Sequence, residues 1–356
     1  IQHFSSLGHQ LICIFINCIS MYRNIEELKS QLSEPKEITI ITHYNPDGDA
    51  LGSSLALRHY LTGKGHKVTC IVPNNFPNYL EWMPGSDSVI IANKHLNTAH
   101  KHILNCDILF AVDMNGAHRS GKELEEVIDQ STAYRIHIDH HINPMFSCNF
   151  CFSETTTTST CEMVYRFINE YLDDIQSLSK EAAECIYSGI ITDTGSLSYS
   201  CNHTITYRIL EHLISLGVNG EAIHRLIYDN YSTSRLRLLG VALNNLKIME
   251  ELETSYMYLS KKELQENEFK DGDTEGFVNY GLSLRCVKFT AFFTEKENRI
   301  RISFRSKGDF DVNTFASTYF SGGGHKNAAA SYHYDTLENT IKYFEEVVRN
   351  HPELKK

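Results

Sequence analysis

Short apolar runs alternate with longer stretches of helical spacing through the first two hundred residues. The runs have the length of buried strands and lie at residues 37–42, 66–72, 106–112 and 134–138. Helical spacing is found at residues 21–33, 51–61, 160–171 and 180–191. Strands that alternate with helices are typical of a mostly parallel sheet with helices on its faces. The pattern therefore predicts an α/β first domain over residues 21–202.

The pattern changes twice beyond this domain. Residues 203–249 show only helical spacing with short Gly or Ser interruptions, which predicts a helical linker. From residue 250 to 356, segments such as SYMYLS, LRCVKFTAFFTE and NRIRISFRS alternate like antiparallel strands, and FDVNTFASTYF has helical spacing. We therefore expect a second, smaller α/β domain over residues 250–356.

The first twenty residues are expected to lie outside the native fold. The chain begins with Ile1, and Met21 begins a segment with helical spacing. The apolar stretch at residues 11–19 is too short to span a membrane. It also lacks the basic flank and the cleavage site of a signal peptide. We expect residues 1–20 to be an upstream or non-native extension; a buried N-terminal strand is the alternative.

Composition and charge exclude several classes of protein. Hydrophobic residues make up 42% and charged residues 22%, near the averages for a globular protein. The chain has 33 Lys+Arg against 44 Asp+Glu and a net charge of −11. This balance argues against a protein that coats long duplex nucleic acid. No apolar run is long enough to predict a membrane span. A small anionic ligand beside metal ions remains compatible with the charge.

The ten cysteines favour a reduced, cytoplasmic chain. Most of them lie inside apolar runs, and their number is too small for a disulfide scaffold of this length. Cys148 and Cys151 form a C-x-x-C pair, but no second pair follows at the spacing of a zinc finger. A zinc or redox role for this pair is the less favoured alternative.

Side chains that bind metals follow the first predicted strand. His43, Asp47 and Asp49 lie in the loop HYNPDGD, where Pro46 and Gly48 permit a tight turn. One imidazole and two carboxylates suit Mn²⁺ or Mg²⁺. A polar turn is the alternative, because Asp-Gly is a common turn dipeptide.

Three further segments place acidic or imidazole side chains after apolar runs. Asp113 ends CDILFAVD, Asp139, His140 and His141 follow RIHI, and Asp193 lies in GIITDTG. Taken singly, each segment could be a turn or a helix cap. Because the carboxyl ends of parallel strands meet at one edge of a sheet, we expect all of them to converge with the first loop. Several aspartates without nearby Lys or Arg would repel one another, and two divalent cations would offset that repulsion.

Five motifs in fixed order resemble the DHH phosphoesterase superfamily. They are HYNPDGDALGSS, AVDMNGAHRSG, HIDHH, GIITDTG and SGGGHKNAAA, and they extend over roughly residues 35–345. The chain is most similar to the short two-domain members, the nanoRNases or oligoribonucleases and the phosphoadenosine-phosphate phosphatases. The resemblance implies a DHH catalytic domain followed by a smaller, DHH-associated α/β domain that binds the substrate.

The resemblance implies two bound divalent ions, Mn²⁺ first and Mg²⁺ as the alternative. The implied metal ligands are His43, Asp47, Asp49, Asp113, His140 and Asp193. His43 and Asp47 would hold one ion together with Asp193. Asp49 and His140 would hold the other, and Asp113 would bridge both. This agrees with the general chemistry of two-metal sites, in which the ions activate a hydroxide and stabilise the attacking and leaving oxygens.

The resemblance also implies residues for catalysis and substrate binding. Asp113 and His141 would be catalytic, with His141 on the scissile phosphate or the nucleophile, and Asp139 would orient an imidazole. The implied substrate contacts are Arg305, Gly322, Gly323, Gly324 and His325. Glycines let backbone N–H groups approach an anion, and a helix beginning at KNAAA would add a positive dipole. An ordinary glycine-rich turn and a solvated arginine face are the alternatives.

The expected function is hydrolysis of very short RNA to mononucleotides, of 3′-phosphoadenosine 5′-phosphate to AMP, or of both. The expected partners are short RNA or nucleotide bisphosphates, with no membrane and no long duplex; a homodimer is compatible with the sequence. Rival enzymes are a pyrophosphatase or exopolyphosphatase and a cyclic-dinucleotide phosphodiesterase. A non-catalytic nucleotide-binding module is the rival from another class, and it would lack one or more of the metal ligands.

Overall fold

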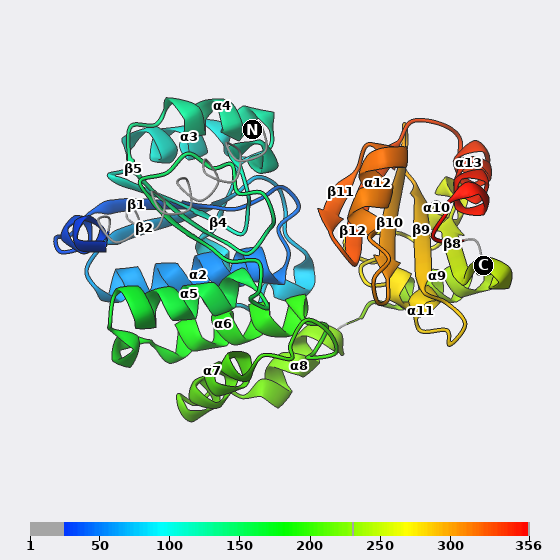
Figure 1. Ribbon diagram of the computed structural model, residues 1–356. Coiled ribbons are helices and arrows are strands. Elements are labelled where there is room, and N and C mark those ends of the chain that lie inside the picture. The colour runs from blue at the N-terminus through cyan, green and yellow to red at the C-terminus, as the bar shows by residue number, and fades with distance from the viewer. Residues whose placement is uncertain (1–24, 230, 355–356) are drawn as a thin grey trace, which may run out of the picture. The chain divides into compact units, whose positions relative to one another are not determined.

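The computed structural model describes residues 25–229 and 231–354. The expectations for residues 1–20 and for Met21 lie outside the described residues. The chain divides into two compact units, of which the first ends at residue 230 and the second begins at residue 231 (Figure 1). The segment 203–249, expected to be a separate linker, is thus divided between the two units.

The first unit contains a six-stranded, fully parallel sheet in the order β3-β2-β1-β4-β5-β6. Its strands are β1 (Glu37–Ile41), β2 (Lys67–Val72), β3 (Ile90–Ile91), β4 (Ile108–Val112), β5 (Tyr134–Asp139) and β6 (Phe150–Ser153). The apolar pattern did not predict the short edge strands β3 and β6. The strand order reverses between β1 and β4, so the loops at their carboxyl ends diverge and leave room for a ligand.

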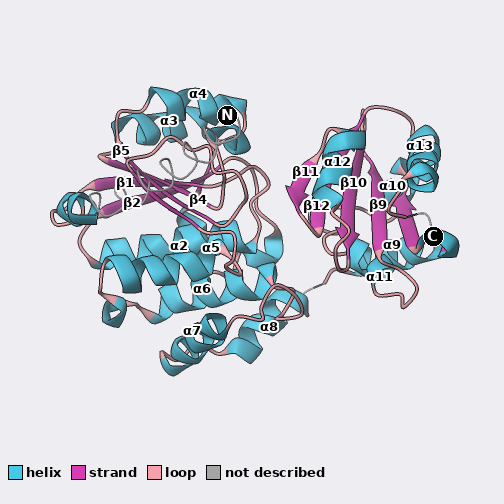
Figure 2. Ribbon diagram, in the orientation of Figure 1, coloured by secondary structure: helices cyan, strands magenta, loops and turns pink. Residues whose placement is uncertain are grey.

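Helices cover both faces of this sheet. The helices of this unit are α2 (Gly48–Gly63), α3 (Leu96–Asn105), α4 (Lys122–Gln130), α5 (Thr160–Arg166), α6 (Lys180–Asp193), α7 (Thr204–Ser215) and α8 (Gly220–Tyr228), and residues 25–31 are also helical. Helices α3 and α4 lie on one face, and α2, α5 and α6 lie on the other (Figure 2). None of the described helices has the length and apolar character needed to cross a membrane.

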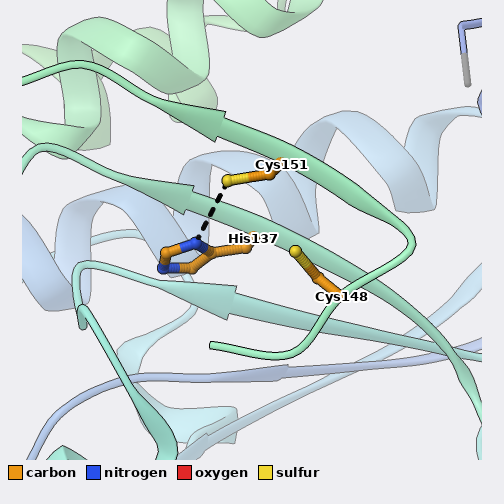
Figure 3. Close-up of side chains that lie close together, drawn as sticks. All are labelled: His137, Cys148 and Cys151. Atoms are coloured by element: carbon orange, nitrogen blue, oxygen red, sulfur yellow. Dashed lines mark hydrogen bonds between the residues drawn. The ribbon is translucent and has the colours of Figure 1, made fainter. Parts of the chain in front are cut away.

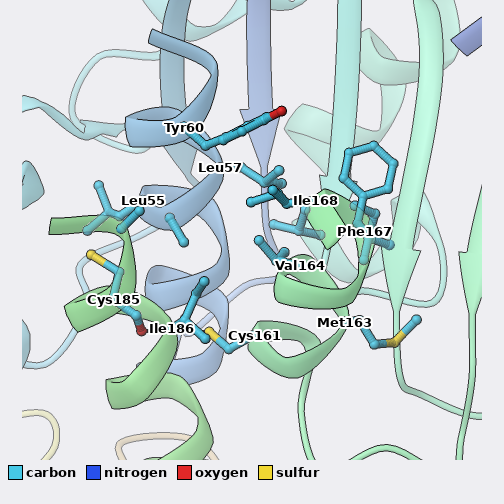
Figure 4. Close-up of a cluster of buried hydrophobic side chains, with 14 of the residues drawn as sticks. Leu55, Leu57, Tyr60, Cys161, Met163, Val164, Phe167, Ile168, Cys185 and Ile186 are labelled. Atoms are coloured by element: carbon cyan, nitrogen blue, oxygen red, sulfur yellow. Dashed lines mark hydrogen bonds between the residues drawn. The ribbon is translucent and has the colours of Figure 1, made fainter. Parts of the chain in front are cut away.

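Helices α2, α5 and α6 share one apolar core with the sheet. Leu55 of α2, Val164 of α5 and Ile186 of α6 are fully buried in it (Figure 4). Burial of one such side chain contributes about 1.5–3 kcal/mol. Gly52 lets α2 and α6 approach closely, because a Cβ at this position would lie 2.6 Å from the carbonyl oxygen of Cys185. This close approach sets the spacing between α6 and α2, whose first turn carries Asp49.

The second unit contains a six-stranded mixed sheet in the order β11-β12-β10-β9-β8-β7. Its strands are β7 (Lys247–Met249), β8 (Thr254–Leu259), β9 (Phe289–Glu295), β10 (Ile300–Ser306), β11 (Gly323–His325) and β12 (Ala328–His333). Its helices are α9 (Thr233–Asn244), α10 (Lys261–Glu266), α11 (Val278–Leu282), α12 (Val312–Phe320) and α13 (Leu337–Asn350). Phe289, Phe304, Phe315 and Phe344 form the centre of its core.

Two predictions for the second unit are wrong. Strands β8 and β9 pair in parallel, because α10 and α11 lie between them in the chain and form a crossover connection. The segment KNAAA leads into strand β12 rather than into a helix. Its alanines favour a helix intrinsically, but pairing with β10 on one side and β11 on the other overrides that preference. This segment therefore directs no helix dipole at the glycines of β11.

Candidate metal centre

Loops at the carboxyl ends of β1 and β4 carry the first predicted ligands. Asp47 is the N-cap of α2, and its Oδ1 accepts hydrogen bonds from the backbone N–H groups of Asp49 (3.0 Å) and Ala50 (3.1 Å). This cap fixes the first turn of α2 and with it the position of Asp49, which lies in that turn. Asp113 directly follows β4 and has φ of +58°, a left-handed conformation that few residues other than glycine adopt. Such strained backbone is concentrated at functional sites.

The carboxylate of Asp113 lies between two histidines. Its Oδ2 is 3.3 Å from His43 Nε2, and its Oδ1 is 3.6 Å from His140 Nε2. Ligand atoms lie roughly 2.0–2.2 Å from Mg²⁺ or a similar ion, so two ligands of one ion are roughly 3.0–3.6 Å apart. Each oxygen of Asp113 can therefore share an ion with a different histidine, as a bridging carboxylate does.

Two aspartates surround His140 on the other side of this bridge. His140 Nε2 lies 3.9 Å from Asp49 Oδ2 and 3.7 Å from Asp193 Oδ2. Asp193 is the last residue of helix α6, which agrees with the helical spacing predicted for residues 180–191. It reaches His140 because α6 packs along α2 and ends beside the loop that follows β5.

His43 is oriented toward the bridge by its own backbone neighbour. Its Nδ1–H donates a hydrogen bond to the carbonyl oxygen of Tyr44 (2.9 Å), which turns Nε2 toward Asp113 and, at 3.9 Å, toward Asp47 Oδ1. Histidines that bind metals commonly donate their second N–H to a carbonyl in this way. The structure thus brings together all six residues that were predicted as ligands.

The buried carboxylates of this site repel one another, and nearby positive charge would stabilise their ionised forms. Burial, followed by the charges of Asp113 and Asp193, raises the pKa of Asp49 well above its usual value. Burial opposes a charge on His43, but the hydrogen bond with Asp113 and the charges of Asp47 and Asp113 together outweigh it and raise the pKa of His43 to about 9. Protons on Asp49 and His43 thus offset the acidic cluster, and bound cations would replace them. A donor set of only carboxylate oxygens and imidazole nitrogens fits Mn²⁺ or Mg²⁺.

The first turn of α5 holds two of the carboxylates, although none of its residues was predicted as part of the site. Backbone N–H groups of Thr160 and Cys161 donate to Asp49 Oδ2 (2.6 Å) and Oδ1 (2.8 Å). The Thr160 hydroxyl donates to Asp113 Oδ1 at 2.8 Å. Gly189 of α6 leaves space for Asp49, because a Cβ there would lie 2.9 Å from Asp49 Oδ1. The sequence signal was the helix start at Ser159, whose side chain caps α5.

Thr160→Val is expected to weaken metal binding without unfolding the protein. The substitution keeps the shape of the side chain and removes the hydroxyl that orients Asp113. Loss of such an orienting partner typically lowers metal affinity or activity about 10–100-fold. Isothermal titration with Mn²⁺ measures the effect, and Thr160→Ser, which retains the hydroxyl, should restore affinity. Unchanged affinity in Thr160→Val would show that this hydroxyl does not position Asp113.

Asp139 orients the second histidine of the pair at the end of β5. Asp139 is fully buried, and its Oδ1 accepts a hydrogen bond of 2.8 Å from His141 Nδ1. The rings of His140 and His141 meet edge to face, with centroids 4.8 Å apart. The two histidines therefore present different edges to the site.

The second unit places two predicted substrate contacts on one face of its sheet. Arg305 of β10 and His325 of β11 are both register partners of Ala328 in β12, the strand between them. Residues in register point to the same face, and neighbouring strands are about 4.8 Å apart. Arg305 and His325 therefore lie on one face, about 10 Å apart at the backbone. The alternation of apolar and polar side chains predicted for NRIRISFRS is present in β10, where Ile300 and Ile302 are buried in the core.

Close backbone packing accounts for two of the predicted glycines. A Cβ at Gly322 would lie 2.4 Å from the carbonyl oxygen of Ala330, and one at Gly324 would lie 2.3 Å from that of Ala328. The N–H of Gly324 donates to Asn313 Oδ1 at 2.8 Å. These glycines let β11 approach β12. A contact of these glycines, or of Gly323, with a substrate phosphate remains a prediction.

Comparison with known proteins gives the same two-part division. The model of the DHH family, N-terminal domain, matches residues 37–190, and that of the DHHA1 domain matches residues 254–350. The structure of an exopolyphosphatase-related protein from Bacteroides fragilis is 38% identical, has a TM-score of 0.89, and aligns over 94% of this chain and 98% of its own.

Two more distant relatives extend the comparison. The probable bifunctional oligoribonuclease and PAP phosphatase NrnA of Streptococcus mutans is 26% identical over 309 residues, 86% of this chain and 93% of its own. RecJ from Thermus thermophilus, solved in complex with Mn²⁺, shares the fold, with 14% identity and a TM-score of 0.55 over 95% of this chain and 56% of its own. The chain therefore belongs to the DHH family of phosphoesterases, with a DHH domain followed by a DHHA1 domain.

Proposed function

We propose that this protein is a Mn²⁺-dependent enzyme that hydrolyses very short RNA to mononucleotides and 3′-phosphoadenosine 5′-phosphate to AMP. The observation that carries the proposal is the position of Asp113, whose two carboxylate oxygens face His43 and His140 within a group of six ligands. The substrate class is supported by the relative from Streptococcus mutans, which is named for both activities. Mg²⁺ is the alternative ion for the same donor set.

Each residue of the site has a task in this proposal. Two divalent ions held by the six ligands would supply an activated hydroxide and stabilise charge on the phosphate. The Tyr44 carbonyl and the Thr160 hydroxyl orient His43 and Asp113 so that their ligand atoms face the ions. Asp139 accepts the Nδ1–H of His141, so His141 is held in the tautomer whose Nε2 can accept a proton from the attacking water or contact the phosphate.

Substrate length would be selected by the second unit in this proposal. Arg305 and His325 lie on one face of its sheet, where a guanidinium and an imidazole can contact the terminal phosphate or the backbone of a short RNA. Arginine is suited to this role because its planar donors match the oxygens of a phosphate. A short substrate offers few phosphates, so one such contact would contribute a large share of its binding energy.

A substrate panel tests the proposal. Purified protein with Mn²⁺ is assayed on dinucleotide RNA, 3′-phosphoadenosine 5′-phosphate, pyrophosphate, polyphosphate and a cyclic dinucleotide. We expect dinucleotide RNA or the bisphosphate to be hydrolysed with the highest kcat/KM, EDTA to abolish the activity, and Mn²⁺ to restore it.

Each rival function has its own outcome in this panel. Preference for pyrophosphate or polyphosphate would indicate a phosphoanhydride hydrolase, and preference for the cyclic substrate would indicate a cyclic-dinucleotide phosphodiesterase. Binding of nucleotides without turnover of any compound would indicate a non-catalytic module. Any of these three results would overturn the proposal.

A further inference from the structure

A second group of metal-binding side chains lies on strands β5 and β6, outside the six ligands of the candidate metal centre. It consists of His137 in β5, Cys148 in the loop before β6, and Cys151 in β6 (Figure 3). One ligand atom from each lies within 4.8 Å of the other two. His137 and Cys151 are register partners on neighbouring parallel strands, so their side chains share one face of the sheet.

His137 is fixed in the orientation that a metal ligand requires. It is fully buried, and its ring stacks on Phe146 with centroids 5.4 Å apart. Its Nε2–H donates to the carbonyl oxygen of Met114 at 2.8 Å, and because a carbonyl can only accept, the proton must be on Nε2. In the neutral imidazole, the form that binds metals, the lone pair of Nδ1 therefore faces Cys151. A histidine that donates one N–H to a carbonyl and presents its other nitrogen is the usual arrangement at protein metal sites.

The spacing of the three side chains matches a tetrahedral zinc site. Zinc binds imidazole nitrogen at about 2.0–2.1 Å and thiolate sulfur at about 2.3 Å, so at the tetrahedral angle these two ligand atoms are about 3.6 Å apart. His137 Nδ1 and Cys151 Sγ are 3.6 Å apart. Two thiolates of one site would be about 3.8 Å apart, and the sulfur atoms of Cys148 and Cys151 lie within 4.8 Å of each other.

The chemistry of the group also separates it from the first centre. Two thiols and one imidazole are soft and borderline ligands that select zinc over Mn²⁺ or Mg²⁺. The hydrogen bond between the two thiols lowers the pKa of Cys151, which favours its thiolate form, and raises the pKa of Cys148, whose proton a bound ion would displace. Cys148 is half-buried and Cys151 is exposed, so an ion can enter from solvent.

We propose that His137, Cys148 and Cys151 bind one Zn²⁺ ion, with the fourth position open to water or to an external ligand. A histidine and two cysteines with an open position form a known type of zinc site. The ion would fasten the loop at residues 140–149 to β5 and β6. Because β5 leads directly into Asp139 and His140, the clip would also fix the start of the segment that enters the candidate metal centre.

Cobalt substitution tests the proposal on the full-length chain. Co²⁺ bound by thiolates produces a sulfur-to-cobalt charge-transfer absorption, which the oxygen and nitrogen ligands of the first centre cannot produce. Reduced, metal-free protein is titrated with Co²⁺ in the absence of oxygen. We expect the absorption to rise to a plateau and to be lost on addition of Zn²⁺, which binds nitrogen and sulfur sites more tightly than Co²⁺ where geometry is tetrahedral.

Matched variants locate the signal. Cys148→Ser and Cys151→Ser should each weaken or abolish the absorption, whereas Cys286→Ser, at an exposed cysteine of the second unit, should leave it unchanged. Asp113→Asn should also leave it unchanged, so a failure of the proposed phosphoesterase function would not affect this result. The cysteine variants are preferred to variants of His137, because that side chain is fully buried and its loss could unfold the strand.

Either of two results would overturn the zinc site: wild-type protein without thiolate absorption, or absorption that persists in the double variant of Cys148 and Cys151. The first of these results has a further reading. If mild oxidation of the wild type also removes two titratable thiols, and the double variant loses none, Cys148 and Cys151 form a disulfide rather than a metal site.

Discussion

Asp113→Asn is expected to lower kcat on dinucleotide RNA by about a hundredfold or more, which is about 2.7 kcal/mol or more in the activation barrier. The two oxygens of Asp113 face His43 and His140 at 3.3 and 3.6 Å. An amide of the same shape offers one weak oxygen ligand and an NH₂ group that repels a cation. It also removes the charge best placed to hold two divalent ions in one site.

The fold should survive this substitution. Asparagine retains an oxygen that can accept the hydrogen bond from the Thr160 hydroxyl, and its volume is close to that of aspartate. Circular dichroism and thermal unfolding of the metal-free protein check this expectation. Asp107→Asn is the matched control, because Asp107 lies at the opposite end of the same strand, where its carboxylate accepts a hydrogen bond from the backbone N–H of Glu37. If Asp113→Asn keeps more than about a tenth of the wild-type rate at saturating Mn²⁺, the bridging role is wrong.

Arg305→Ala and His325→Ala are expected to raise KM for dinucleotide RNA by about 10–100-fold. A hydrogen bond to a charged group contributes about 1.5–3 kcal/mol, and about 1.4 kcal/mol corresponds to a tenfold change in affinity. Bis-p-nitrophenyl phosphate, a generic ester that needs no distant contact, should be hydrolysed at nearly the wild-type rate by both variants. The comparison of the two substrates separates substrate binding from the chemical step.

Arg301→Ala is the matched control for this prediction. Arg301 lies on the same face of β10 as Arg305 and carries the same charge, but its register partner is Tyr332 rather than Ala328. It should change KM much less than Arg305→Ala does. An equal loss with both substrates would show that Arg305 and His325 support the chemical step or the structure. In that case the proposed division of labour between the two units would be wrong.

Local sequence was sufficient to predict the parts of the fold that short-range forces decide. Apolar runs such as residues 106–112 became buried strands, and amphipathic stretches became the helices that cover them. His43, Asp113 and His140 could be assigned to one site because each follows a strand of the same parallel sheet. The carboxyl ends of such strands meet by geometry alone, so the convergence needed no knowledge of side-chain packing.

The same reasoning failed where a residue's environment comes from a distant segment. Alanine has the strongest helix propensity, yet residues 328–330 form a strand because β10 and β11 supply hydrogen-bond partners on both sides. The parallel pairing of β8 with β9 likewise depends on a crossover connection that the alternation of side chains does not encode. Propensity and periodicity describe one segment at a time, and neither specifies its neighbours.

Tertiary structure alone decided how the candidate metal centre and the proposed zinc site are completed. Thr160 meets Asp113 across 47 positions of sequence, and Asp193 reaches His140 from the end of a helix rather than a strand. The C-x-x-C pair lacked a partner at any spacing typical of zinc motifs, because its third member, His137, comes from the neighbouring strand in register with Cys151. Sequence alone determined which chemical groups this protein has. The packing of α5 and α6 and the register of β5 with β6 determined which of these groups meet. The reason is that only folding brings such distant backbone segments within bonding distance.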